Sequence, residues 1–291
     1  MSKNTAGAAL TAALRADIER LLTAEPEVRA DEDDSVHQMR VATRRLRSVL
    51  RSYKKLLDAD AANRMRTELS WLAGLLGVAR DAEVRGERFT ALLDRFAEAD
   101  CAALEPTRDR LVRAEQDRYR EAHAEILTAL DSKRYRAMRR ELKTWRANPP
   151  MPKSARKADA DEVFDKVLRA DRKRVRGLIR AEPTAAPADR VELLHDIRKS
   201  AKRLRYSCDA AKPTLGERAA DLGTRAKHLQ TVLGDHRDAV ESFDALRARA
   251  AEARAAGEDT ALYVTLADAE DTAAGGHLAH YPAAAAAIDK S

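Results

Sequence analysis

Hydrophobic side chains recur every three or four positions along most of the chain, which is the spacing of an amphipathic helix. In "VHQMRVATRRLRSVLRSYKKLL" (36–57), the apolar residues fall on one side of a helical wheel: Met39, Ala42, Leu46, Val49, Leu50, Tyr53 and Leu57. No stretch shows the convincing alternation of a strand. The pattern predicts an all-α fold with helices near 6–24, 34–57, 60–79, 81–101, 106–130, 132–147, 160–181, 189–211, 216–234, 236–256 and 259–280.

The chain also resembles itself at a spacing of about 157 residues. "VHQMRVATRRLRSV" (36–49) recurs as "LHDIRKSAKRLRYS" (194–207), and "LAGLLGVARDA" (72–82) recurs as "LQTVLGDHRDA" (229–239). A shorter pair, "LLTAEP" and "LIRAEP", precedes them in the same order. Three ordered matches indicate an internal duplication into two similar helical units.

A proline-rich stretch, "RANPPMPKSARKADAD" (146–161), separates the two copies, since prolines end a helix. The sequence therefore predicts a first half over 1–150 and a second half over 151–291. Long helices with short connections favour antiparallel bundles. We expect the two units to be packed together or side by side.

The net charge is modest, at +6 from 54 Lys and Arg against 48 Asp and Glu. The positions of the charges along the chain are more informative than their total. The stretch 36–57 contains no acidic residue. One stripe of the first helix carries His37, Arg40, Arg44, Arg47 and Arg51. The repeated helix carries His195, Arg198, Lys202 and Arg205, with Arg45 and Arg203 flanking each stripe and Lys199 near the second.

Like charges three and four residues apart repel one another, so such a row needs compensation. Acidic residues on a neighbouring helix would supply it in a purely structural arrangement, and an external anion would supply it in a binding site. Two further helices are basic to a lesser degree, and their candidate residues are secondary: Arg134, Arg139, Arg169, Lys173, Arg176 and Arg180.

These blocks, together with "SKRYRAMRRELKTW" (132–145), resemble the CHAD family of histidine-containing helical domains over about residues 5–280. The resemblance implies two pseudo-twofold-related, four-helix-bundle-like halves with a basic central cleft or pore. It implies non-catalytic binding of inorganic polyphosphate and association with polyphosphate granules. The matching residues are His37, Arg40, Arg44, Arg45, Arg47, His195, Arg198, Lys199, Lys202, Arg203 and Arg205. Arg51 of the first stripe joins them as a candidate polyphosphate-binding residue. Ser70 departs from the family pattern, which often has a basic residue there.

Other functions remain open as alternatives. Arginine rows also bind nucleic-acid backbones, although the basic faces hold almost none of the aromatic side chains on which bases stack. A phosphohydrolase or metal-binding protein is less favoured, since no Walker loop, nucleophile elbow or metal-ligand spacing occurs. We expect no cofactor and no metal.

The cellular location follows from what the sequence lacks. No apolar run approaches the length of a membrane span, and the N-terminal stretch lacks the apolar segment of a signal peptide. Cys101 and Cys208 form no pairing motif, which favours a reducing compartment. We therefore expect a cytoplasmic protein with no membrane partner.

Overall fold

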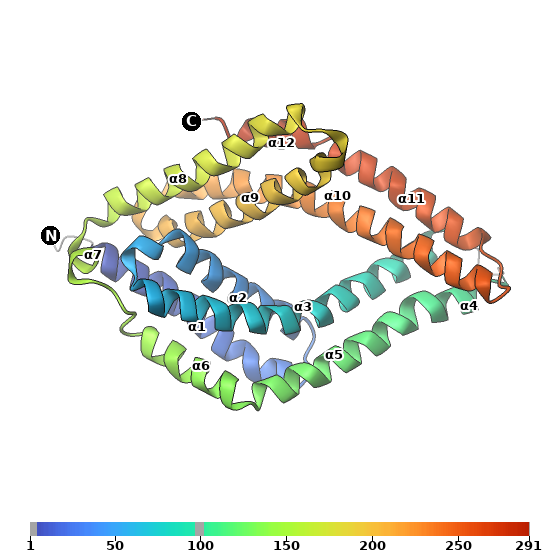
Figure 1. Cartoon of the computed structure of the whole chain (residues 1–291), viewed down its shortest axis with the longest axis horizontal. Helices are drawn as coiled ribbons and strands as arrows, with labels where there is room; N and C mark the ends of the chain where they lie inside the picture. Colours follow the sequence, from blue (N-terminus) through green and yellow to red (C-terminus); the bar gives the residue numbers. More distant parts are fainter. Residues whose placement is uncertain (1–4, 97–101, 291) are drawn as a thin grey trace. The chain divides into compact units, whose positions relative to one another are not determined.

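A computed structural model describes residues 5–96 and 102–290, and it confirms the predicted all-α class (Figure 1). Its long helices are α1 (Ala6–Arg29), α2 (Ser35–Ser52), α3 (Ala59–Phe96), α5 (Ala114–Leu130), α6 (Lys133–Trp145), α8 (Ala160–Ala181), α9 (Pro187–Leu215), α10 (Glu217–Ala255) and α11 (Ala261–Leu278). Shorter pieces are η1 (Lys54–Leu56), α4 (Leu104–Arg108), η2 (Asp109–Arg113), α7 (Lys153–Lys157), η3 (Glu182–Thr184) and α12 (Tyr281–Ala287).

Two helices are longer than the sequence predicts. The expected breaks near residues 80 and 235 are wrong, because α3 and α10 run through both positions without interruption. Each position follows a glycine, Gly77 or Gly234, and an interior glycine costs only up to about 1 kcal/mol relative to alanine. Without a proline to remove a backbone donor, the helix continues. The predicted end of the helix near Cys101 lies outside the described residues.

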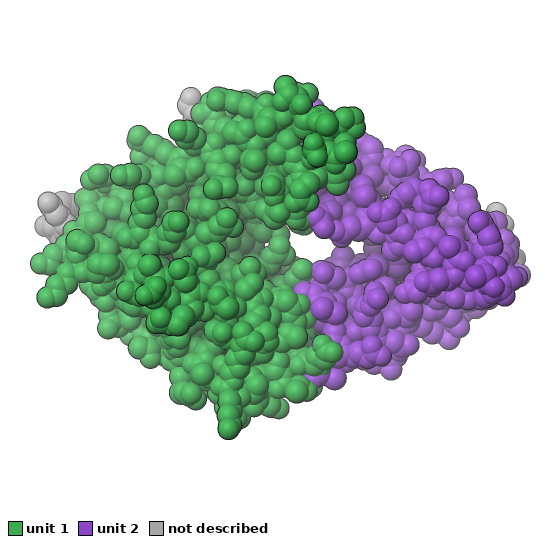
Figure 2. Space-filling model, in the orientation of Figure 1, with its two compact units in different colours: residues 1–76, 125–230, 284–291 green, residues 77–124, 231–283 purple. Residues whose placement is uncertain are grey.

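The chain packs into two compact units, coloured separately in Figure 2. Unit 1 comprises residues 1–76, 125–230 and 284–291, and unit 2 comprises residues 77–124 and 231–283. This is a division by packing, and each unit draws residues from both sides of position 150. The predicted halves are a division by sequence repeat and stay a prediction. Among the described residues, no helix combines the length and apolar character that a membrane span needs.

Unit 1 is built on two helical hairpins, α1–α2 and α8–α9, with α2 packed against α9. The apolar face predicted for residues 36–57 is buried, including Leu46 and Tyr53. The Tyr53 hydroxyl donates a hydrogen bond to the backbone carbonyl of Ser207 at 3.0 Å, and its ring lies 4.6 Å from that of Phe164. These contacts join α2, α8 and α9, and so fix which sides of α2 and α9 remain outside the core.

Unit 2 has its own core, formed by side chains from α3, η2, α10 and α11, among them Phe89, Leu111 and Leu246. The carboxylate of Glu270, which is 1 % exposed, accepts two hydrogen bonds from Arg88 at 2.5 Å. A buried carboxylate needs such a partner, because an unpaired charge in the interior is strongly unfavourable. The charges at this position are therefore balanced within the protein.

Candidate anion-binding cavity

A basic cavity of about 630 Å³ lies in unit 1 between α2, α3 and α9. Its lining side chains are polar, and seven of them are cationic: Arg44, Arg47, Arg51, Arg66, Lys199, Lys202 and Arg203. The remaining lining residues are neutral: Ser48, Asn63, Thr67 and Ser70. Among the described residues that line it, none is acidic or aromatic. The arrangement concentrates positive charge in a space large enough for an anionic ligand.

Two arginines on the α2 wall are unneutralised. Burial lowers the pKa of Arg44, and the charges of Arg40, Arg198 and Arg47 lower it further. Burial also lowers the pKa of Arg47, assisted by its cationic neighbours on α2 and α3. Within the described chain, no carboxylate oxygen forms an ion pair with either guanidinium. Both groups stay charged at neutral pH, so the wall holds real like-charge repulsion.

The α9 wall is partly neutralised by the protein itself. Asp171 of α8 lies 2.7 Å from the guanidinium of Arg203, and it accepts hydrogen bonds from Ser52 and Ser207, both at 2.7 Å. Burial lowers the pKa of Arg203, while the Asp171 carboxylate opposes that change. Lys199 pairs with Asp196 at 2.6 Å, and this hydrogen bond raises the pKa of the lysine.

The two related basic helices present different sides to the cavity. Arg203 of α9 lines it, whereas Arg45, at the matching position of α2, does not. The Arg45 guanidinium contacts the carboxylates of Asp17 at 2.8 Å and Asp209 at 2.7 Å. These two contacts raise the pKa of Arg45 despite its burial. The structure thus places Arg45 in a charge cluster between α1, α2 and α9, where it joins helices together.

The remaining residues of the two predicted stripes lie beside the cavity or away from it. Arg40 and Arg198 lie close enough to Arg44 to depress its pKa, but neither lines the cavity. Arg205 donates a hydrogen bond to Gln230 at 3.4 Å and also lies outside. The two histidines, His37 and His195, are half-buried on α2 and α9 and are not among the lining residues.

The secondary candidates on α8 lie outside the cavity as well. Arg169 pairs with Asp165 at 2.5 Å, and Arg176 pairs with Asp289. Lys173 and Arg180 are exposed on the same helix. The structure therefore does not bring these α8 residues together with the lining residues of the cavity.

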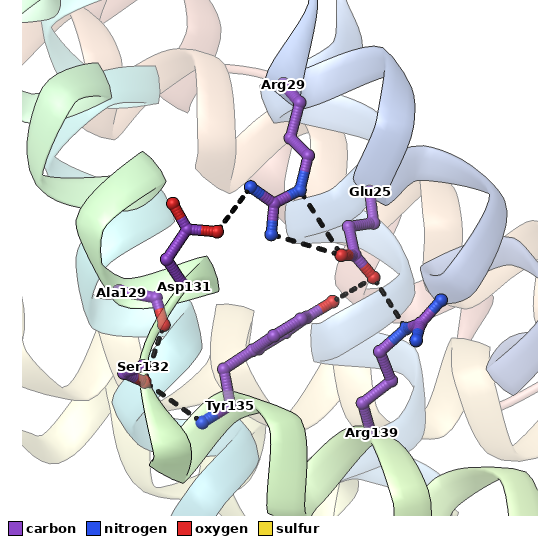
Figure 3. A network of polar contacts seen from close by, with 7 residues as sticks. All are labelled: Glu25, Arg29, Ala129, Asp131, Ser132, Tyr135 and Arg139. Atoms are coloured by element: carbon purple, nitrogen blue, oxygen red, sulfur yellow. Dashed lines mark hydrogen bonds and ion pairs between the residues drawn. The ribbon is translucent and has the colours of Figure 1, made fainter.

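The secondary candidates on α6 are held by carboxylates of unit 1. Arg134 pairs with Glu68 at 2.6 Å and lies 4.2 Å over the ring of Trp71. Arg139 contacts Glu25 at 2.8 Å, and the same carboxylate accepts a hydrogen bond from the hydroxyl of Tyr135 at 3.0 Å (Figure 3). Both arginines thus anchor α6 to its neighbours.

Most of the third wall was missed by the sequence analysis, which singled out only Ser70 on it. On α3, the polar residues Asn63, Arg66, Thr67 and Ser70 recur at helical spacing and share one face. Of the neighbouring charges, that of Arg66 lowers the pKa of Arg47 most. The signal in the sequence was this polar row, opposite the apolar residues of the same helix. In the described part of the chain, no cluster of His, Cys, Asp and Glu is arranged to hold a metal ion.

Fold and cavity together define an all-α protein with a cationic cavity in its larger compact unit. The sequence model of the CHAD domain matches residues 12–247, about four-fifths of the chain. The chain therefore belongs to the CHAD domain family, which is known for binding inorganic polyphosphate.

Two curated relatives from Mycobacterium tuberculosis are similar to the chain. Uncharacterized protein MT2285 (strain CDC 1551 / Oshkosh) and Uncharacterized protein Rv2226 (strain ATCC 25618 / H37Rv) are each 38% identical over 251 residues. The match covers 86% of this chain and 47% of each relative, so the chain spans about half the length of these curated relatives.

Two solved structures share the fold. PptA from Streptomyces chartreusis aligns with a TM-score of 0.78 and 22% identity, covering 97% of this chain and 99% of that chain. The CHAD domain from the plant Ricinus communis aligns with a TM-score of 0.66 and 22% identity, covering 100% of this chain and 93% of that chain. At this identity the likeness concerns the fold.

Proposed function

We propose that this chain binds inorganic polyphosphate in the basic cavity of unit 1, without catalysis, and thereby associates with polyphosphate granules in the cytoplasm. The observation that carries the proposal is the composition of the cavity lining, with seven cations and no carboxylate among its described residues. Polyphosphate is a linear polyanion without bases, so its binding site needs rows of cations. Arginine is suited to it because a guanidinium grips phosphate oxygens bidentately.

An unsatisfied donor next to the cavity supports the same ligand class. The Nε of Arg198 is buried and makes no hydrogen bond within the described chain. Buried polar groups normally have a partner, so this isolated donor among other cations is positive charge that no protein group offsets there. Arg198 and Arg40 would then extend the positive field around Arg44 and need not contact the ligand. We assign the same role to His37 and His195.

Nucleic acid is the second candidate, since a phosphate backbone would enter the same cavity. The lining favours polyphosphate because its described residues include no aromatic side chain on which a base could stack. Competition at equal phosphate concentration distinguishes the two ligands: RNA should displace bound polyphosphate poorly. Efficient displacement by RNA would instead make the chain a backbone-binding protein for nucleic acid.

The decisive experiment is calorimetry with long-chain polyphosphate at two salt concentrations. Each neutralised phosphate releases counterions, so seven contacts should lower the affinity by about a thousandfold between 50 and 200 mM salt. The double substitution Arg44→Glu and Lys202→Glu should weaken binding by about a hundredfold, because it reverses charge on two walls at once. A matched double variant, Lys212→Glu and Arg254→Glu, changes two exposed cations outside the cavity and should bind almost normally.

The same purified protein can be assayed for catalysis. Release of inorganic phosphate from polyphosphate, measured with magnesium and with manganese, should stay at the level of a protein-free control. Sustained turnover by the wild type that is lost in the Arg44→Glu and Lys202→Glu variant would overturn the non-catalytic assignment.

A further inference from the structure

A second basic row lies on the outer face of α6, outside the cavity. It consists of four exposed cations: Lys133, Arg136, Arg140 and Lys143. At 100° per residue they fall within about 80° of one another, and the first and last are about 15 Å apart along the helix. The opposite face of the helix is the buried one, formed by Tyr135, Met138, Leu142 and Trp145.

The cations of α6 differ in whether they are paired with a carboxylate. The inner pair, Arg134 and Arg139, meet the carboxylates of Glu68 and Glu25 at 2.6 and 2.8 Å. For the four outer cations, no ion pair with a carboxylate occurs within the described residues. An ordinary solvated helix face mixes signs, because like charges three and four positions apart destabilise it by a few tenths of a kcal/mol per pair.

The helix dipole adds to this imbalance. The first turn of α6 carries no acidic residue, although its N-terminal end is the positive end of the dipole. Lys133 stands in that turn, where a cation is unfavourable. The outer row is therefore retained against its own repulsion, and Lys133 is also retained against the dipole, whereas Lys143 in the last turn is favoured by it. An external anion would offset the repulsion.

We propose that the outer face of α6 is a second contact surface for long polyphosphate, engaged by the part of a chain that extends beyond the cavity. The inference rests on the proposed function of the cavity. The two surfaces belong to the same unit, and one side chain of α6 reaches the helix that forms the third wall: Arg134 contacts Glu68 and Trp71, adjacent in sequence to the lining residues Thr67 and Ser70. A linear polyanion longer than the cavity can meet both.

The helix that carries the outer row is held firmly in unit 1. The Glu25 carboxylate fixes α6 through Tyr135 and Arg139, and the side chain of Ser132 accepts a hydrogen bond from the first turn at 3.1 Å (Figure 3). Because the backbone of the helix is already fixed, only the side chains of the row must be ordered on binding. A second contact on the same protein then adds to the affinity for long chains through a high effective concentration. The outer face carries no aromatic side chain, which favours a polyanion without bases over single-stranded nucleic acid.

The test compares tripolyphosphate, which is short enough for the cavity alone, with long-chain polyphosphate. The α6 variant replaces four residues, Lys133→Gln, Arg136→Gln, Arg140→Gln and Lys143→Gln. It should bind tripolyphosphate like the wild type but lose about tenfold or more of the affinity for long chains. Its salt dependence for long chains should become shallower by about three in the log–log slope. A control with the same charge change replaces four other exposed cations, Lys212, Lys227, Arg247 and Arg254, by glutamine.

The control variant should lose less than twofold for either ligand. An equal loss for tripolyphosphate and long chains in the α6 variant, or no loss for long chains, overturns the second surface while the cavity assignment stands. A variant that loses affinity for single-stranded RNA but keeps it for long polyphosphate also overturns it. If wild-type protein binds neither phosphate ligand, the proposed function itself fails. The half-variant with only Lys133→Gln and Arg136→Gln serves if the full variant does not fold, and should show a smaller loss confined to long chains.

Discussion

The carboxylate of Asp171 holds the guanidinium of Arg203 at 2.7 Å on the wall of the basic cavity. Asp171 is 3 % exposed and accepts three polar contacts, two of them from the hydroxyls of Ser52 and Ser207. The contact therefore joins α2, α8 and α9 at the cavity wall. It also fixes the orientation of one cation that the ligand would meet.

Substitution of Asp171 by asparagine should destabilise the protein by about 2–4 kcal/mol, because it leaves the largely buried Arg203 charge without its counter-charge. Urea unfolding measures this change. The exposed pair of Arg120 and Asp117 provides the control, since Asp117→Asn should cost less than about 1 kcal/mol. Equal losses of stability in the two variants would show that the Asp171 contact is no more important for the fold than an exposed ion pair.

Substitution of Arg66 by glutamine should have opposite effects on stability and binding. Arg66 lowers the pKa of Arg47 by repulsion, so its removal should raise the free energy of unfolding by about 0.5 kcal/mol at low salt. The gain should shrink as salt screens the repulsion. Polyphosphate affinity should fall because one lining cation is lost. Thermal unfolding at two salt concentrations and calorimetry measure the two effects.

The matched substitution for Arg66 is Arg134→Gln, which removes a cation paired with Glu68. It should lower the stability and leave tripolyphosphate binding unchanged. If Arg66→Gln also lowered the stability at low salt, the cavity would not hold the repulsion described above.

Stability should fall as pH rises above about 10, partly through Tyr135. Burial and the neighbouring Glu25 carboxylate raise the pKa of this phenol well above its usual range. Above pH 10 the unfolded chain loses the phenolic proton while the folded protein keeps it, so unfolding becomes more favourable. The variant Tyr135→Phe should lose about 1 kcal/mol at neutral pH but show a flatter decline between about pH 9 and 11.

Part of this decline should remain in Tyr135→Phe, because burial also raises the pKa of Tyr53. Urea unfolding across this pH range measures the slopes. Parallel curves for the wild type and Tyr135→Phe would contradict the assignment of the decline to Tyr135.

The helical class and the α2 wall could be predicted because both depend on periodicity within one segment. The spacing that buries Leu46 and Tyr53 also turns Arg44, Arg47 and Arg51 to the opposite side. The repeated motif alone did not determine which arginine faces the cavity. Arg45 and Arg203 hold matching positions, yet only Arg203 reaches the cavity.

The difference arises from tertiary contacts that are distant in sequence. The carboxylates of Asp17 and Asp209 hold Arg45 away from the cavity. Sequence spacing could not identify either carboxylate as a partner of Arg45. On α9 the cavity side, marked by Lys199, Lys202 and Arg203, is rotated by about 70° from the predicted stripe. Arg66 was missed for the same reason, because the side of α3 that faces the cavity depends on how α3 packs.

Because the cavity holds arginines without a carboxylate partner, the anions of the buffer should affect the measured stability of this protein. Phosphate, sulfate and citrate are small anions that would occupy the folded cavity and have no equivalent site on the unfolded chain. By mass action each would raise the melting temperature in proportion to how well it fits. Melting temperatures taken in Tris and in phosphate should therefore differ, and protein purified from cells should carry cellular anions with it.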